Sequence, residues 1–351
     1  MPAAPRTLQL VQLLRGIASM LVVFLHITVN YGETFGTPLL GDFFSFGGSG
    51  VDIFFVLSGF IITYTNRQHI GQPGHTLNFV KRRFVRIYPI YWIIITALLV
   101  VRFLLPQFYN SSFDTSATGL LQTYLLLPGH MMVNGVSWTL TNELFFYLLF
   151  VCSFFIPDKR ISLGIMIAYL LFLLGLGLTG REQLSPGSYS QLLTFSMNIE
   201  FFLGVIIALV VHKIGLRWAM PVLITGILLF AAGVYCTLDN IVLSPTTFNR
   251  VLLFGIPSFF IVLGVTAYEV HKPVGLHNIF MRLGDASYSI YLFHLPVVAA
   301  FFRILAKTGI QNPAVIYLLV LALVIIIAIA GMVIYEKIEK PLIKVLNRKL
   351  G

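Results

Sequence analysis

The chain has 351 residues, of which 58% are hydrophobic and only 10% are charged. Its mean hydropathy of +0.90 excludes an ordinary soluble domain, and apolar runs long enough to span a bilayer recur along its length. These runs are continuous and lack the period-two alternation of a transmembrane β-barrel, so an all-α integral membrane protein is predicted. The formal charge of +10 does not indicate nucleic acid binding, because the basic residues lie mainly between the apolar runs.

A bundle of about ten transmembrane helices is predicted, forming a single domain over 1–351 with no appended soluble domain. The spans cover residues 11–31, 47–65, 84–104, 137–156, 161–179, 190–211, 218–236, 251–267, 284–305 and 312–335. The first is too long for the apolar part of a signal peptide and is expected to stay as a membrane helix. Cys152 and Cys236 lie inside apolar runs, so free thiols are expected.

One segment between the third and fourth spans fits no crossing. Residues 105–136 contain the apolar run Leu120–Leu127, which ends in Pro128 and is too short to cross the bilayer. Around 115–130 we therefore expect a re-entrant or interfacial segment, tolerated only where it packs against protein.

The distribution of Lys and Arg orients this bundle. With the N-terminus inside, the inner loops contain RQHIGQPGHTLNFVKRR, PDKR, HKIGLR and HKPVGLHNIFMR, and the basic tail EKIEKPLIKVLNRKLG follows the last span. The outer loops hold only Arg181 and Lys307. The positive-inside rule therefore favours ten crossings with both termini in the cytoplasm.

One face of the first span is the first candidate site. Arg15 and His26 are eleven residues apart, almost three turns, so both lie on one face, about 16 Å apart along the axis. An arginine within the bilayer costs about 2.5–3.5 kcal/mol on insertion scales, so this face is expected to line a polar cavity. His26 is then a candidate general base. The alternative is that both side chains only satisfy hydrogen bonds between helices.

A basic cluster at the cytoplasmic entrance of the third span is the second candidate. Arg83 and Arg86 are three residues apart in Lys81–Pro89 and are neighbours on a helix. Such a cluster suits a polyanion such as the phosphates of a nucleotide cofactor. Charges that set the topology and meet lipid headgroups are an equally supported alternative.

The third candidate is the segment Ser137–Glu143, at the start of the fourth span. Glu143 lies near the predicted depth of His26, and a catalytic imidazole usually has a carboxylate or carbonyl on its other nitrogen. Glu143 is therefore predicted to orient His26. A carboxylate that merely lines a cavity is the alternative, and Glu200, also within a span, competes for the role.

The fourth candidate is the segment Asp285–His294, where Tyr288, Tyr291 and His294 recur every three residues. Tyrosines of this kind are often only interfacial anchors, but a histidine well inside a span is rarely so. Glycines at 47–50, followed by Asp52 and Ser58, predict close helix contact along a polar seam. No HExxH, CxxC, GxSxG or GxxxxGK[ST] motif is present, so no metal site, serine elbow or phosphate loop is expected.

Taken together, these motifs resemble those of the membrane acyltransferase 3 family, in the same order along nearly the whole chain. They are Arg15 with His26, GVDIFFVLSGF at 50–60, RRFVRIYP at 82–89, SWTLTNELFFY at 137–147, SYSIYLFH at 287–294 and IEKP at 338–341. The family includes O-acetyltransferases of exopolysaccharide, lipopolysaccharide and peptidoglycan. The chain looks most like the stand-alone exopolysaccharide branch.

The resemblance implies an enzyme of the bacterial inner membrane that transfers an acyl group, most simply acetyl, from cytoplasmic acetyl-CoA. The acceptor would be a hydroxyl of an extracytoplasmic glycan or lipid-linked saccharide. It implies that His26 and Glu143 belong to the catalytic site, and that Arg15, Arg83, Arg86 and Tyr88 receive the donor. Ser137, Trp138, Asn142, Tyr291 and His294 are then expected near the acceptor.

The mechanism expected from these assignments is a channel through the bundle, in which donor and acceptor meet at His26. No partner beyond membrane lipids and the glycan is implied, no nucleic acid is expected, and a homo-oligomer stays open. The competing class is a proton-coupled transporter or flippase of a lipid-linked sugar or small amphiphile, which also needs ionisable groups in the membrane. A membrane sensor without turnover is the third.

Overall fold

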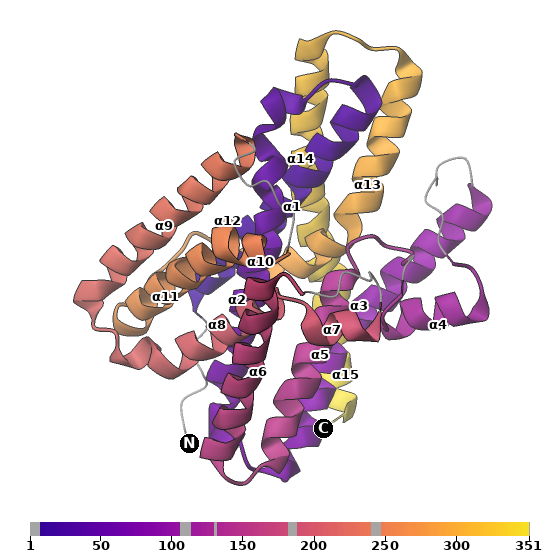
Figure 1. Cartoon of the computed structure of the whole chain (residues 1–351). Helices are drawn as coiled ribbons and strands as arrows, with labels where there is room; N and C mark the ends of the chain where they lie inside the picture. The colour runs from indigo at the N-terminus through magenta and orange to yellow at the C-terminus, as the bar shows by residue number, and fades with distance from the viewer. Residues whose placement is uncertain (1–7, 106–113, 130–131, 182–187, 240–246, 351) are drawn as a thin grey trace.

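The computed structural model describes residues 8–105, 114–129, 132–181, 188–239 and 247–350, and all regular elements within these ranges are helical (Figure 1). The α-helices are α1 (Gln9–Phe35), α2 (Gly50–Asn66), α3 (Thr76–Leu104), α4 (Ala117–Leu125), α5 (Trp138–Cys152), α6 (Lys159–Thr179), α7 (Tyr189–Thr194), α8 (Asn198–Val210), α9 (Leu216–Leu238), α10 (Thr247–Arg250), α11 (Ile256–His271), α12 (Asn278–Asp285), α13 (Ser287–Thr308), α14 (Pro313–Ile334) and α15 (Lys340–Leu350). Nine helical segments of the described residues are long and apolar enough to cross a membrane. The all-α membrane fold is therefore confirmed.

The predicted span at 190–211 is not one helix. It is divided into α7 and the 13-residue α8, and the side-chain amide of Asn198 donates to the carbonyl of Leu192 at the break (2.6 Å). Thirteen helical residues cover about 20 Å, less than the hydrocarbon core of about 30 Å. The prediction of one continuous span here was wrong, because the residues on both sides of the break were interpreted as a single apolar run.

The segment around 115–130 forms the short helix α4, which lies beside α3 (Figure 1). The last carbonyls of a helix lack partners within it and must find them elsewhere when water is excluded. Here Tyr91 donates to the carbonyl of Thr123 (2.8 Å), Trp92 to that of Tyr124 (2.8 Å) and Tyr88 to that of Leu125 (3.0 Å). The expected packing of this segment against protein is therefore found, while 106–113 and 130–131 lie outside the described residues.

The helix of the last predicted span, 312–335, continues beyond residue 335. The helix continues from α14 through one π-helical turn (Tyr335–Glu339) into α15, and Pro341 lies in the first turn of α15. A wider turn of this kind takes up a change in the hydrogen-bond register along a continuous helix. The structure thus places Glu339 in the wider turn, facing the bundle with 1% of its surface exposed.

Two glycines allow α2 and α8 to pack with their backbones in contact. A Cβ on Gly59 would lie 2.0 Å from the carbonyl oxygen of Phe201, and one on Gly204 would lie 2.1 Å from that of Val56. Small residues at such crossings are typical of membrane helix pairs. Inside the bilayer the hydrophobic effect does not drive helices together, and close backbone contact stabilises the pair through van der Waals packing.

Gly204→Ala is expected to lower the free energy of unfolding by about 1–3 kcal/mol, because the added methyl group collides with backbone that cannot move aside. Gly164→Ala is the control: this glycine lies in α6 with no atom within 4 Å of the added carbon, and helix propensity alone favours alanine by about 0.5–1 kcal/mol. Thermal denaturation in detergent would test this. Equal stability of the two variants would contradict the close crossing.

Candidate active site

One pocket gathers polar side chains from α1, α2, α3, α5 and α13. Its charged and hydroxyl-bearing lining residues are Arg15, Ser58, Arg83, Arg86, Thr139, Glu143, Tyr147, Ser287, Tyr288 and Tyr291. Apolar side chains of α2, among them Phe54 and Ile62, complete the wall. A mostly apolar cleft with a few converging polar groups is the usual form of a small-molecule site.

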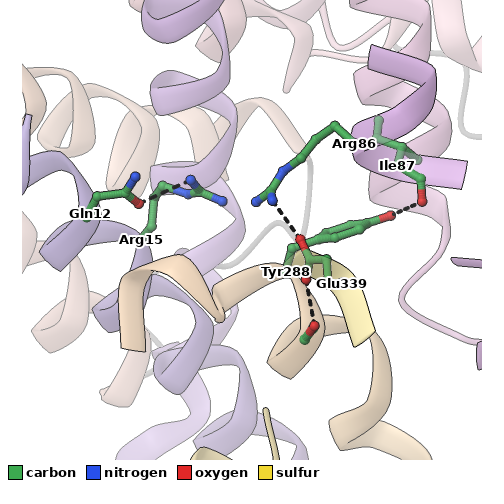
Figure 2. A network of polar contacts seen from close by, with 7 residues as sticks. Gln12, Arg15, Arg86, Ile87, Tyr288 and Glu339 are labelled. Carbon is green, nitrogen blue, oxygen red and sulfur yellow. Dashed lines mark hydrogen bonds and ion pairs between the residues drawn. The ribbon is translucent and has the colours of Figure 1, made fainter. Parts of the chain in front are cut away.

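At one side of this pocket, Arg15 and Arg86 point toward one another from α1 and α3 (Figure 2). Arg86 forms an ion pair with Glu339 (2.6 Å) and lies over the ring of Tyr288 at 5.5 Å. Glu339 also accepts a hydrogen bond from Ser289 (2.6 Å). The positive charge of Arg86 is therefore already matched by a buried carboxylate.

Arg15 and Arg83 are held differently. Arg15 donates to the side-chain amide oxygen of Gln12 (3.2 Å), and Arg83 lies 5.5 Å from the ring centres of both Phe79 and Tyr147. Neither takes part in a salt bridge among the described residues, and the buried Nε of Arg83 has no hydrogen-bond partner there. Aromatic faces can hold a guanidinium while leaving its N–H groups available. Both arginines can therefore donate to an anion in the pocket.

Asp285 is an acidic neighbour of this group at the end of α12, just before the membrane span, which begins at Ser287 in the structure and not at 284 as predicted. Its burial raises the pKa of the carboxyl, and the charges of Arg15 and Arg86 oppose that rise. Arg15 and Asp285 do not form an ion pair with each other among the described residues.

Removing Arg86 is expected to affect the fold. Arg86→Ala leaves the carboxylate of Glu339 buried without its counter-charge and should lower the free energy of unfolding by about 1–3 kcal/mol, less than for a fully buried pair because 28% of the Arg86 side chain is exposed. Arg282→Ala is the matched control, since its pair with Glu336 is exposed at 50% and 36% and should contribute only about 0–1 kcal/mol. Denaturation of both variants tests the difference, and equal losses would contradict a structural role for Arg86.

Glu143 lies in the pocket but not on His26. It accepts hydrogen bonds from Ser58 (2.8 Å) and from the hydroxyl of Tyr147. His26 instead has its Nδ1 2.9 Å from the carbonyl of Val22 and 3.1 Å from Nε2 of His294. The contact expected between Glu143 and His26 is therefore not the one that the structure shows.

His26 itself does not line the pocket. Tyr291 does, and its ring centre lies 5.9 Å from that of the fully buried His294, which in turn lies 5.0 Å from that of His26. The hydroxyl of Tyr291 is hydrogen-bonded to that of Thr139 (2.8 Å). The contacts that link the pocket to His26 thus run through Tyr291 and His294, so a single cavity that holds both the arginines and His26, as the expected channel requires, is not what the structure shows.

Several other expected site residues lie away from the pocket. Tyr88 binds the end of α4, Trp138 packs between Phe55 and Phe195, and Asn142 donates to the carbonyl of Trp138 (2.9 Å). Ser137, the residue directly before α5, is fully buried, and Glu200 is fully buried against Gly255. None of the five is among the lining residues.

Sequence reasoning assigned no role to Tyr147, which lines the pocket, or to Glu339, which pairs with Arg86. Tyr147 follows Glu143 by four positions, one helical turn, and this spacing could have paired them. Glu339 appeared in the sequence analysis only within the IEKP motif of the family resemblance, with no role assigned to it. Its burial beside Arg86 follows from the continued last helix, which no local sequence signal indicated.

Comparison with known proteins assigns the class. The family model described as an acyltransferase domain matches residues 9–333, and the chain belongs to this acyltransferase 3 family. The protein is therefore a multi-pass membrane acyltransferase.

Two relatives are similar over most of their length. The chain is 29% identical over 314 residues to the exopolysaccharide production protein ExoZ of Rhizobium meliloti (strain 1021), covering 87% of this chain and 92% of that protein. It is 26% identical to the acyltransferase MdmB of Streptomyces mycarofaciens, covering 98% and 94% respectively. No solved structure matches the chain.

Proposed function

We propose that the chain transfers an acetyl group from cytoplasmic acetyl-CoA to a hydroxyl of an extracytoplasmic glycan or lipid-linked saccharide. The observation that carries this proposal is the convergence of Arg15, Arg83 and Arg86 on one pocket. Within the described residues, only Arg86 of the three forms an ion pair, with Glu339. Guanidinium groups of this kind suit the phosphates of a coenzyme A. The name of ExoZ supports a polysaccharide acceptor.

The orientation is part of the same proposal. With the broken segment α7–α8 counted as a tenth crossing beside the nine long helical segments, the basic loops favour both termini in the cytoplasm. In that orientation Arg15, Arg83 and Arg86 all lie near the inner ends of their helices. The donor would then enter from the cytoplasm, and the acceptor would approach the outer half of α1, where the side chain of His26 is partly exposed.

In the proposed reaction, His26 takes the proton of the acceptor hydroxyl as its oxygen attacks the thioester carbonyl. The C–S bond breaks, and the leaving thiolate receives the proton from His26, so acyl ester and free CoA thiol are the products. Direct transfer and a covalent acyl-histidine intermediate are both open. In either case the thioester has to pass from the pocket, where Tyr291 and Thr139 are hydrogen-bonded, to His26, which does not line that pocket.

Release of free CoA thiol by the purified protein in lipid nanodiscs tests this function. We expect thiol release that depends on a glycan acceptor, together with O-acetylated glycan detected by mass spectrometry in cells that carry the protein and not in cells that lack it. Uptake or flipping of a lipid-linked sugar without thiol release would instead identify a transporter. Succinyl-CoA and longer acyl-CoAs in the same assay define the acyl group.

A further inference from the structure

We propose that His294 is a positioning residue for His26: it holds the His26 imidazole in the tautomer whose Nε2 is an unprotonated base. The inference rests on the proposed function, because it assigns a partner to the base of that reaction. It also replaces Glu143 in the orienting role that the sequence suggested.

The tautomer of His294 follows from its own contacts. Its Nδ1 lies 3.1 Å from the carbonyl oxygen of Ile290 and 2.8 Å from that of Tyr291. Both partners accept only, so Nδ1 must carry the hydrogen. In the neutral ring, Nε2 of His294 is then an acceptor.

Burial keeps His294 neutral. The residue has 0% of its surface exposed, and its contacts within the described residues are backbone carbonyls, the ring of Tyr291 and His26, with no carboxylate. A charged imidazolium there would be desolvated without a counter-charge, which is strongly unfavourable.

His26 then has a single consistent arrangement. Its Nδ1 faces the carbonyl oxygen of Val22 at 2.9 Å and Nε2 of His294 at 3.1 Å, and both are acceptors. The hydrogen of the neutral His26 ring therefore sits on Nδ1 and is shared between these two groups. The lone pair is left on Nε2, the nitrogen that no described residue hydrogen-bonds, and this is the atom that can take a proton from an alcohol.

The placement of the two histidines fixes the ring as well as the proton. Val22 lies one turn before His26 on α1, whereas His294 reaches the same nitrogen from α13. Contacts from two helices restrict the rotation of the ring in the way that a buried acidic group orients the base of a catalytic triad. A neutral acceptor in place of a carboxylate orients the base without adding a negative charge beside the thioester.

The test compares His294→Leu with His294→Gln in nanodiscs, because glutamine can offer an acceptor oxygen near the place of Nε2 and leucine cannot. We expect His294→Leu to lower kcat by about 10²–10⁴-fold, the range of general base contributions, with little change in KM for acetyl-CoA. His294→Gln should recover at least part of the lost kcat. Phe302→Leu is the control for packing in α13, since Phe302 is 1% exposed and lies in an apolar cluster two turns further along.

A second readout does not depend on turnover. Solid-state ¹⁵N NMR of histidine-labelled protein, with His26→Asn to assign the His26 signals, should show Nδ1 protonated and Nε2 unprotonated in the wild type. In His294→Leu the share of the Nδ1-protonated form should fall, because only the carbonyl of Val22 is left to accept its hydrogen. A wild type that releases no CoA thiol overturns the proposed function. Any effect of His294 on catalysis is then overturned as well, even if the tautomer of His26 is the expected one. Full kcat in His294→Leu, equal losses in the leucine and glutamine variants, or a His26 ring protonated on Nε2 in an active wild type each overturn the positioning role alone.

Discussion

Replacing His26 with alanine should reduce acyl transfer by about 10²–10⁴-fold while protein yield and monodispersity in detergent stay normal, because the substitution removes a general base and little packing. His26 is partly exposed and makes two hydrogen bonds through one nitrogen. Its loss leaves the neutral acceptor of His294 without a donor, a modest cost compared with a buried charge. The measurement is CoA thiol release with and without glycan acceptor.

His69→Gln is the control for this variant, because His69 lies in the short connection between α2 and α3. Within the described part of the chain, its hydrogen bonds are with Gln68 and Gln72 and its ring contact is with His75. Unchanged transfer in His26→Ala would remove His26 from the mechanism. Loss of transfer in both variants would point to a general effect of the substitutions on the membrane fold.

Replacing Arg15 and Arg83 together with alanine is expected to raise KM for acetyl-CoA by about 100-fold or more. A hydrogen bond to a charged group contributes about 1.5–3 kcal/mol, and each 1.4 kcal/mol is a factor of about ten in affinity. Both guanidinium groups face the pocket without a salt bridge among the described residues, so their donors are available to phosphate. The kinetic constants of the purified variants measure the effect.

Arg82→Ala separates this effect from a general loss of positive charge. Arg82 is next to Arg83 in α3, but it does not line the pocket, so its removal should leave KM nearly unchanged. An unchanged KM in the double variant would show that Arg15 and Arg83 do not bind the donor and would favour a role in setting the membrane topology. Equal increases in the double variant and in Arg82→Ala would indicate attraction of the donor by surface charge instead of a defined site.

The sequence was informative where single residues stood out against an apolar background. Arg15 and Glu143 interrupt membrane spans, and Arg83 and Arg86 gather at the start of another, so the high cost of placing such groups in lipid identified them as candidates. The structure brings all four into one pocket.

The sequence could not predict which of these residues contact one another. The depth of a residue along its helix does not say which neighbouring helix its side chain faces. Glu143 and His26 were assigned similar depths, and α1 and α5 both contact α2, but α1 also packs against α12 and α13 whereas α5 packs against α8. His294 therefore reaches His26, and Glu143 reaches Ser58. The break before α8 was missed for a related reason: a short apolar helix and a longer span have the same composition.

The hydrogen bond between Tyr291 and Thr139 has a consequence for how the two parts of the site move. It joins α13 to α5, and both residues line the pocket that Arg15 and Arg83 also line. The ring of Tyr291 also neighbours that of His294, the hydrogen-bond partner of His26. Any rotation of this tyrosine would therefore change the pocket wall and the surroundings of the two histidines together.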